Sequence, residues 1–160
     1  MMIRFDQGAW RFNYRIVGVA IHDDQVLLHH APTEAFWSLP GGRAELGESA
    51  EQTLRRELRE ELGVEIEVVR LLWVVENFFP YDARNYHELA LYFLMRLPQA
   101  SHYLTQAGPY PCLEPGSELI FQWFSTAPEA LIGLPLLPSF LQTELRQLPE
   151  TTQHRVHYDE

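Results

Sequence analysis

Residues 42–64, GRAELGESAEQTLRRELREELGV, constrain the fold more than any other part of the chain. A glycine-containing loop leads into Ser49 and Gln52, which have the spacing of a helix capping box. Gly63 is well placed to end that helix in the left-handed conformation. We therefore expect one helix over residues 49–62, entered from a tight loop.

This helix would carry a tight group of glutamates beside its apolar face. At about 100° per residue, four apolar residues form one stripe that should face the core: Ala50, Leu54, Leu58 and Leu62. Glu57, Glu60 and Glu61 stand at i, i+3 and i+4, so their carboxylates gather on a neighbouring face. Like charges one turn apart are unfavourable, and partial burial increases that cost. A divalent cation removes the conflict, and Mg²⁺ suits such oxygen donors best, with Mn²⁺ as a substitute.

The loop before the helix resembles a phosphate-binding loop in its glycine spacing only. Gly42, four residues and Gly47 match that spacing, but Glu48 stands where a phosphate-binding loop needs lysine. A carboxylate there would repel phosphate, so we expect this loop to meet a phosphorylated substrate through a metal ion.

Taken together, these positions match one known motif. Gly42, five residues, Glu48, seven residues and then REL-R-EE-L-G-V over 56–64 resemble the complete Nudix box. In an ordinary surface helix with Arg–Glu pairs, there would be no reason for the loop glycine, Glu48, the helix glutamates and the helix-ending Gly63 all to have the spacing of this motif. The resemblance extends loosely over residues 14–148 and implies an α/β/α sandwich around a mixed β-sheet, of the α/β (α+β) class.

The resemblance also implies a reaction and roles for the residues of the box. Enzymes of this family direct a metal-activated water at one phosphorus of a diphosphate linkage. By position, the metal ligands would be Glu57, Glu60, Glu61 and the backbone carbonyl of Gly41, while Arg56 would pair with Glu48 and hold the loop against the helix. The proton of the water would pass to a box glutamate or to an acid outside the box: Glu76, Glu88, Glu114 or Glu118.

The choice of substrate depends on residues outside the box. Pro80 lies sixteen positions after Val64, where ADP-ribose-cleaving relatives usually carry proline, although a proline also simply ends a strand. The residues expected to contact substrate are Trp37, Phe79, Pro80, Tyr81 and Glu118. We expect hydrolysis of an ADP-ribose-like nucleoside diphosphate derivative. The alternatives are a MutT-like pyrophosphatase of oxidised or non-canonical nucleoside triphosphates and a Nudix domain that senses nucleotides without hydrolysing them.

Bulk properties exclude several classes of protein. A chain of 160 residues is expected to form one domain over residues 1–160, and its net charge of −10 argues against binding nucleic acid, including RNA caps. Cys112 is the only cysteine, which excludes an internal disulfide and a cysteine-rich zinc site. It also argues against the isoprenoid isomerase branch of this fold, which needs a cysteine upstream of the box. Residues 1–12 do not resemble a signal peptide and no segment reaches membrane-spanning length, so we expect a cytoplasmic protein, with a homodimer possible.

Apolar patterning predicts the remaining elements. Strands are expected at 14–21, 26–30, 87–97 and 119–124, and residues 65–79 should form one long, bent strand or two strands in succession. The proline- and glycine-rich residues 98–117 should form a long loop. Leucines at helical spacing predict a final amphipathic helix from Leu137 to Leu148, and a polar tail should begin at about Thr151.

Overall fold

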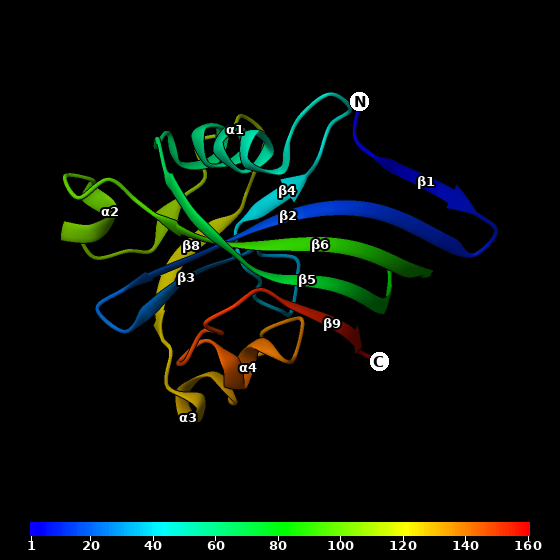
Figure 1. Ribbon diagram of the computed structural model, residues 1–160. Coiled ribbons are helices and arrows are strands. Elements are labelled where there is room, and N and C mark those ends of the chain that lie inside the picture. The colour runs from blue at the N-terminus through cyan, green and yellow to red at the C-terminus, as the bar shows by residue number, and fades with distance from the viewer.

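A nine-stranded mixed sheet with helices on both faces forms the fold (Figure 1). The computed structural model describes all residues, 1–160. The strands are β1 (Arg4–Gln7), β2 (Trp10–His22), β3 (Gln25–His30), β4 (Gly41–Arg43), β5 (Glu67–Tyr81), β6 (Arg84–Arg96), β7 (Tyr110–Pro111), β8 (Ile120–Ser125) and β9 (Gln153–Tyr158). The helices are α1 (Ala50–Leu62), α2 (His102–Thr105), α3 (Pro128–Leu131) and α4 (Leu141–Glu144).

The strand order is β7-β8-β3-β2-β6-β5-β9, and β1 and β4 also pair with β2. The pairs β2–β6 and β5–β9 are parallel, and the other pairs are antiparallel. In Figure 1, α1 lies across one face of the sheet, while α3 and α4 lie on the other. This arrangement confirms the expected α/β/α sandwich around a mixed sheet. None of the helices has both the length and the apolar character needed to cross a membrane.

Alternation along β2 divides the core into two layers. Ile16 packs in the layer beneath α1, while its neighbour Val17 packs in the layer beneath α3 and α4. The predicted apolar stripe of α1 faces the first layer, where Leu54 and Leu58 are fully buried. The stripe therefore anchors the acidic helix on the sheet.

The ends of α1 are those that the sequence predicts. The Ser49 hydroxyl accepts a hydrogen bond from the Gln52 backbone N–H at 3.2 Å, and the Gln52 side chain accepts one from the Ser49 N–H at 2.8 Å. Gly63 adopts the left-handed conformation, with φ 66°, and its N–H donates to the Arg59 carbonyl. Both ends are set by local hydrogen bonds.

Two predictions for the C-terminal region were wrong. The helix expected over Leu137–Leu148 is reduced to the four residues of α4, because only Leu141 reaches the core from a helix, while Leu145 reaches it from the irregular chain that follows. The tail expected from about Thr151 contains β9, which pairs with the edge of β5. Its alternating exposed and half-buried residues are typical of an edge strand, whose backbone hydrogen bonds do not need apolar side chains.

Smaller differences occur elsewhere in the chain. The segment 98–117, expected as a plain loop, contains α2 and β7. The N-terminal residues contribute β1, which pairs with β2 and which the sequence did not predict. The segment 65–79 forms one long bulged strand, β5, that continues to Tyr81.

Candidate active site

The glutamates of α1 differ strongly in exposure. Glu61 is buried at 5% exposure, and the Glu57 side chain is 14% exposed, whereas the Glu60 side chain is 42% exposed. The Oε2 atom of Glu61 has no hydrogen-bond partner in the protein. Burial of the Glu61 carboxylate beside Glu57, without a donor for its Oε2 atom, is unfavourable when both groups are ionised.

Burial also changes the acidity of these two groups. Loss of hydration raises the pKa of Glu61 to about 8, and the negative charge of Glu57 adds to that effect. Burial raises the pKa of Glu57 as well, although the Arg56 guanidinium opposes the increase. The pair therefore binds protons more readily than exposed carboxylates do, and a cation in their place would satisfy both.

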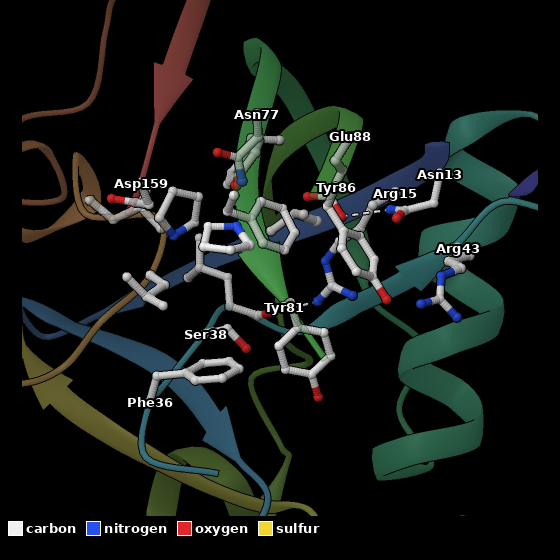
Figure 2. A pocket seen from close by; sticks show the side chains of 18 of the residues that line it. Asn13, Arg15, Phe36, Ser38, Arg43, Asn77, Tyr81, Tyr86, Glu88 and Asp159 are labelled. Carbon is white, nitrogen blue, oxygen red and sulfur yellow. Dashed lines mark hydrogen bonds between the residues drawn. The ribbon is translucent and has the colours of Figure 1, made fainter. Parts of the chain in front are cut away.

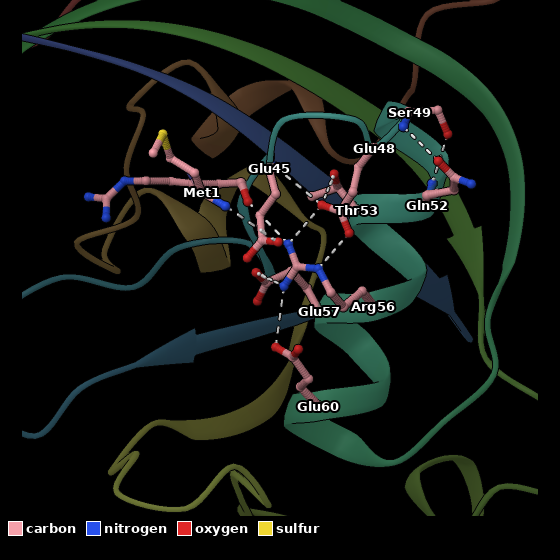
Figure 3. A network of polar contacts seen from close by, with 10 residues as sticks. Met1, Glu45, Glu48, Ser49, Gln52, Thr53, Arg56, Glu57 and Glu60 are labelled. Carbon is pink, nitrogen blue, oxygen red and sulfur yellow. Dashed lines mark hydrogen bonds and ion pairs between the residues drawn. The ribbon is translucent and has the colours of Figure 1, made fainter. Parts of the chain in front are cut away.

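Arg56 joins the loop to the helix (Figure 3). Its Nε and Nη2 atoms donate to the two carboxylate oxygens of Glu48 at 2.7 and 3.0 Å, which confirms the predicted Arg56–Glu48 pair. Its Nη1 atom donates to Glu57 at 3.0 Å and lies 3.4 Å from a carboxylate oxygen of Glu60. The hydrogen bonds from Arg56 lower the pKa of Glu48 to about 2. Glu48 is thus a structural partner that stays ionised and orients Arg56 toward the helix glutamates.

Two glycines let β4 lie close to α1 and to β2. A Cβ atom on Gly42 would overlap the Glu57 carboxyl group, so only glycine allows this carboxylate to lie against the strand. Gly41 has φ 151°, and a Cβ atom there would overlap the Ile16 carbonyl oxygen. Gly42 therefore allows the close approach of β4 to the acidic helix, and Gly41 allows its close approach to β2.

The residues fit a divalent cation, although they do not form a finished ligand cage. No three acidic, histidine or cysteine side chains converge, because Glu60 turns toward Arg56 and solvent while Glu57 and Glu61 stay together. The unpartnered Oε2 of Glu61 and the buried like charges are nevertheless the features that a hard cation stabilises. The oxygen donors available are Glu57, Glu61 and, after a change of side-chain rotamer, Glu60.

The four acids proposed outside the box lie in different places. The Leu113 N–H donates to the Glu61 carbonyl at 2.7 Å, and the neighbouring Glu114 carboxylate contributes to the raised pKa of Glu61. Glu118 is exposed, and Glu76 pairs with His154 at the surface. Glu88 is buried in a cavity on the other side of β2 and β6. Among the four, Glu114 is the acid brought to the helix glutamates.

A cavity of about 390 Å³ opens on the sheet face opposite α1 (Figure 2). Three of the residues predicted to contact substrate line it: Phe79, Pro80 and Tyr81. Trp37 packs instead against Phe124 and His30, and Glu118 is exposed outside the cavity. Phe36 and Tyr86 complete an aromatic wall.

Two arginines between the cavity and α1 were missed by sequence reasoning. Arg15 and Arg43 are cross-strand partners on β2 and β4, and both line the cavity. Arg15 is close enough to Glu57 and Glu61 to oppose the increase in their pKa values. A signal was present, because Arg15 is the one charged residue in the otherwise apolar strand YRIVGVAI and Arg43 directly follows the glycine pair.

Comparison with known proteins identifies the family to which this chain is similar. The family model described as NUDIX domain matches residues 13–131. The putative mutator protein MutT4 of Mycobacterium tuberculosis is 32% identical over 145 residues, covering 78% of this chain and 56% of that protein. An RNA pyrophosphohydrolase of Ruthia magnifica is 37% identical over 84 residues, covering 51% of this chain and 45% of that protein. The chain thus spans about half the length of these relatives.

Solved structures agree with the fold. A MutT NUDIX hydrolase from Burkholderia pseudomallei superposes with a TM-score of 0.60 at 26% identity, covering 82% of this chain and 95% of that one.

Proposed function

The chain belongs to the Nudix domain family, and on that premise we propose that it is a divalent-cation-dependent pyrophosphohydrolase of nucleoside diphosphate derivatives. The observation that carries the proposal is the buried Glu61 with one unpartnered oxygen beside the half-buried Glu57. Arg15 acts on both carboxylates and, with Arg43, lines a substrate-sized cavity. An acidic pair without a cation would only destabilise the fold, which argues against a domain that binds nucleotides without using this site.

The residues of the chain divide the work in this proposal. Glu57, Glu61 and Glu60 hold Mg²⁺ or Mn²⁺, with the Gly41 carbonyl as a further oxygen donor. Arg56, oriented by Glu48, restrains Glu57 and Glu60 on the loop side of the helix. Arg15 and Arg43 attract the diphosphate to the edge of the cavity. When bound, the cation supplies charge neutralisation on the diphosphate and lowers the pKa of an attacking water.

Glu114 is our choice for the group that accepts a proton. It lies on the loop that contacts α1 through the Leu113–Glu61 backbone hydrogen bond, and its charge acts on Glu61. Glu118 lies on the same loop and is exposed, so it serves as a matched control. We expect Glu114→Gln to lower kcat by about 100-fold, as loss of a general base does, and Glu118→Gln to change it less than twofold.

ADP-ribose and similar nucleoside diphosphate sugars come first as substrates. Pro80 lines the cavity next to the aromatic Phe79 and Tyr81, which can stack on a base. A second candidate is a nucleoside triphosphate pyrophosphatase, which is favoured by the similarity to a mutator protein.

The test is a screen of the purified protein with Mg²⁺ against ADP-ribose, nucleotide sugars, dinucleoside polyphosphates and nucleoside triphosphates. Glu57→Gln, Glu60→Gln and Glu61→Gln are compared with Glu51→Gln, which alters an exposed glutamate on the same helix. We expect turnover of at least one diphosphate class and a loss of 100-fold or more in the first three variants. No turnover of any substrate would refute the function, and full activity of all three variants would refute the site. Cleavage of triphosphates with ADP-ribose left intact would replace the first substrate class by the second.

A further inference from the structure

A row of buried polar side chains crosses the floor of the cavity. Asn13 on β2 is in register with Glu88 on β6, which is in register with Asn77 on β5. The three are 1%, 7% and 4% exposed, and all line the cavity (Figure 2). In the next row inward on the same face, Val75 and Ala90 are apolar core, while the third member, Arg15, also lines the cavity. Polar side chains therefore replace core residues only where the sheet meets the cavity.

Several hydrogen-bond donors and acceptors in this row have no partner in the protein. The Asn13 Nδ2 atom donates to Glu88 Oε2 at 2.6 Å, and because a carboxylate can only accept, this bond fixes the orientation of the Asn13 amide. The Oδ1 atoms of Asn13 and Asn77 have no partner in the protein. The Oε1 atom of Glu88 accepts no hydrogen bond, and the Asn13 amide keeps a second N–H. Buried polar groups left in this state cost stability, which a ligand that pairs with them recovers.

The unpaired donors and acceptors indicate which chemical group of a ligand would bind to them. They comprise three acceptors, which are the two amide oxygens and Glu88 Oε1, together with the remaining amide N–H donors of Asn13 and Asn77. Flat aromatic rings of Phe79 and Tyr86 stand on the same face. A planar group with N–H donors next to a ring nitrogen or carbonyl is the complement, which is the hydrogen-bonding edge of a nucleobase. Arg15 and Arg43 lie on the α1 side of the cavity, where the phosphates would lie.

We propose that Asn13, Glu88 and Asn77 form a specificity-determining row that binds the base of the substrate through its N–H donors. This inference rests on the proposed function for its class of substrate. Adenine offers an exocyclic amino group and guanine an amino group beside a ring N–H, so both share the required chemistry. Glu88 acts here in recognition and not as a general base.

The test measures binding without metal and without turnover. Calorimetric titrations compare AMP with purine riboside monophosphate, which lacks the 6-amino group, and GMP with IMP, which lacks the 2-amino group. Ribose 5-phosphate serves as the probe without a base. We expect at least one base-bearing monophosphate to bind about tenfold or more tighter than ribose 5-phosphate, and loss of its amino group to weaken binding by about fivefold or more.

Variants then assign the effect to the row. Glu88→Gln should weaken the preferred nucleotide by about tenfold and reduce the amino-group discrimination to within twofold, while ribose 5-phosphate is unchanged. Glu76→Gln, on the same sheet but paired with His154 at the surface, should leave all affinities unchanged. Equal weakening of ribose 5-phosphate would assign the row to the sugar or phosphate and overturn the proposal, as would full discrimination in Glu88→Gln.

If Glu88→Gln unfolds, the two nucleotide pairs measured with the unaltered protein still test the proposal. Equal affinities within each pair would refute base recognition. The outcome is also separate from the proposed function. Discrimination between nucleotides with no hydrolysis in the substrate screen would uphold the row and refute the enzyme.

Discussion

Several ionisable side chains in this protein are buried with a polar atom left unpaired, which lowers the stability of the folded state. Glu61 is buried, the Glu57 side chain beside it is 14% exposed, and Glu61 Oε2 has no donor. His29 is buried as well, with its Nε2–H donating to the Leu39 carbonyl at 3.0 Å and its Nδ1 unpartnered. We therefore expect the free energy of unfolding to depend on bound cations through Glu57 and Glu61, and on pH through His29.

Glu61→Gln should stabilise the metal-free protein. The amide keeps the shape of the carboxylate but carries no charge, so unfolding at pH 7 should cost roughly 1–3 kcal/mol more. The melting temperature should rise by several degrees without metal, and the increase that Mg²⁺ gives the unaltered protein should disappear. Thermal melts with and without Mg²⁺ measure both effects, with Glu51→Gln as the exposed control. An unchanged response to Mg²⁺ would remove Glu61 from the metal site.

We expect the protein to lose stability in mild acid because of the buried His29 side chain. Burial lowers its pKa to about 3, and the nearby Arg15 charge acts in the same direction. The unfolded chain therefore takes up a proton near pH 6.5 while the folded state does not, so stability is complete above that pH and falls as pH decreases toward 3. Between pH 7 and pH 5 the loss should be about 2 kcal/mol.

Urea unfolding at the two pH values measures this loss. His29→Gln, which keeps a donor for Leu39 but does not titrate, should lose about 2 kcal/mol less than the unaltered protein over this interval. His22→Gln, at a half-exposed position, should behave as the unaltered protein does. Equal pH dependence in both variants would contradict the assignment.

At the scale of elements, the site depends on how closely β4 and α1 approach. Local signals determine α1: the capping box, the left-handed Gly63 and the leucine stripe are all present in the sequence and all observed. The contact of α1 with β4 depends on Gly42, whose missing side chain makes room for the Glu57 carboxyl group. The helix alone therefore does not define the site.

Gly42→Ala should displace Glu57 without unfolding the protein. The added methyl group overlaps the carboxyl end of a side chain that can rotate, so we expect a stability loss of about 1–2 kcal/mol. Metal-dependent kcat/KM should fall by about tenfold or more, because the ligand moves away from its position. Gly133→Ala, where a Cβ atom meets nothing within 4 Å, is the matched control. Full activity of Gly42→Ala would show that Glu57 is not held against β4 for function.

At the scale of the whole molecule, the C-terminal segment closes the sheet and the cavity together. β9 pairs with β5, and Asp159 just beyond it lines the cavity. Asp159 is held by the Ser139 hydroxyl at 2.5 Å and by His157 at 3.1 Å. This segment lies outside residues 13–131, so the family module alone does not enclose the cavity.

Asp159→Ala should release the end of β9 and leave the rest of the fold unchanged. Without its hydrogen bonds to Ser139, the C-terminal end of the strand depends on edge pairing with β5, on the Tyr158–Phe78 stack and on the contact of His157 with Ser139, so it should open more readily. Hydrogen exchange of amides in residues 153–158 should become about tenfold faster or more, while the amides of α1 keep their protection. Glu160→Gln is the control. Unchanged exchange at β9 would show that Asp159 does not hold the strand in place.

Sequence by itself determined the elements whose signals are local. These are the capped helix, its acidic face and the apolar strands, because caps and periodicity act within a few residues. The Arg56–Glu48 pair was expected from the resemblance to the Nudix box. Tertiary structure alone decided what joins them. It placed Arg15 beside the glutamates, aligned Asn13, Glu88 and Asn77 across three strands, brought Glu114 to α1, and turned a polar tail into β9. Those contacts depend on strand register and on free sheet edges, which are properties of the assembled sheet and are not encoded in any one segment.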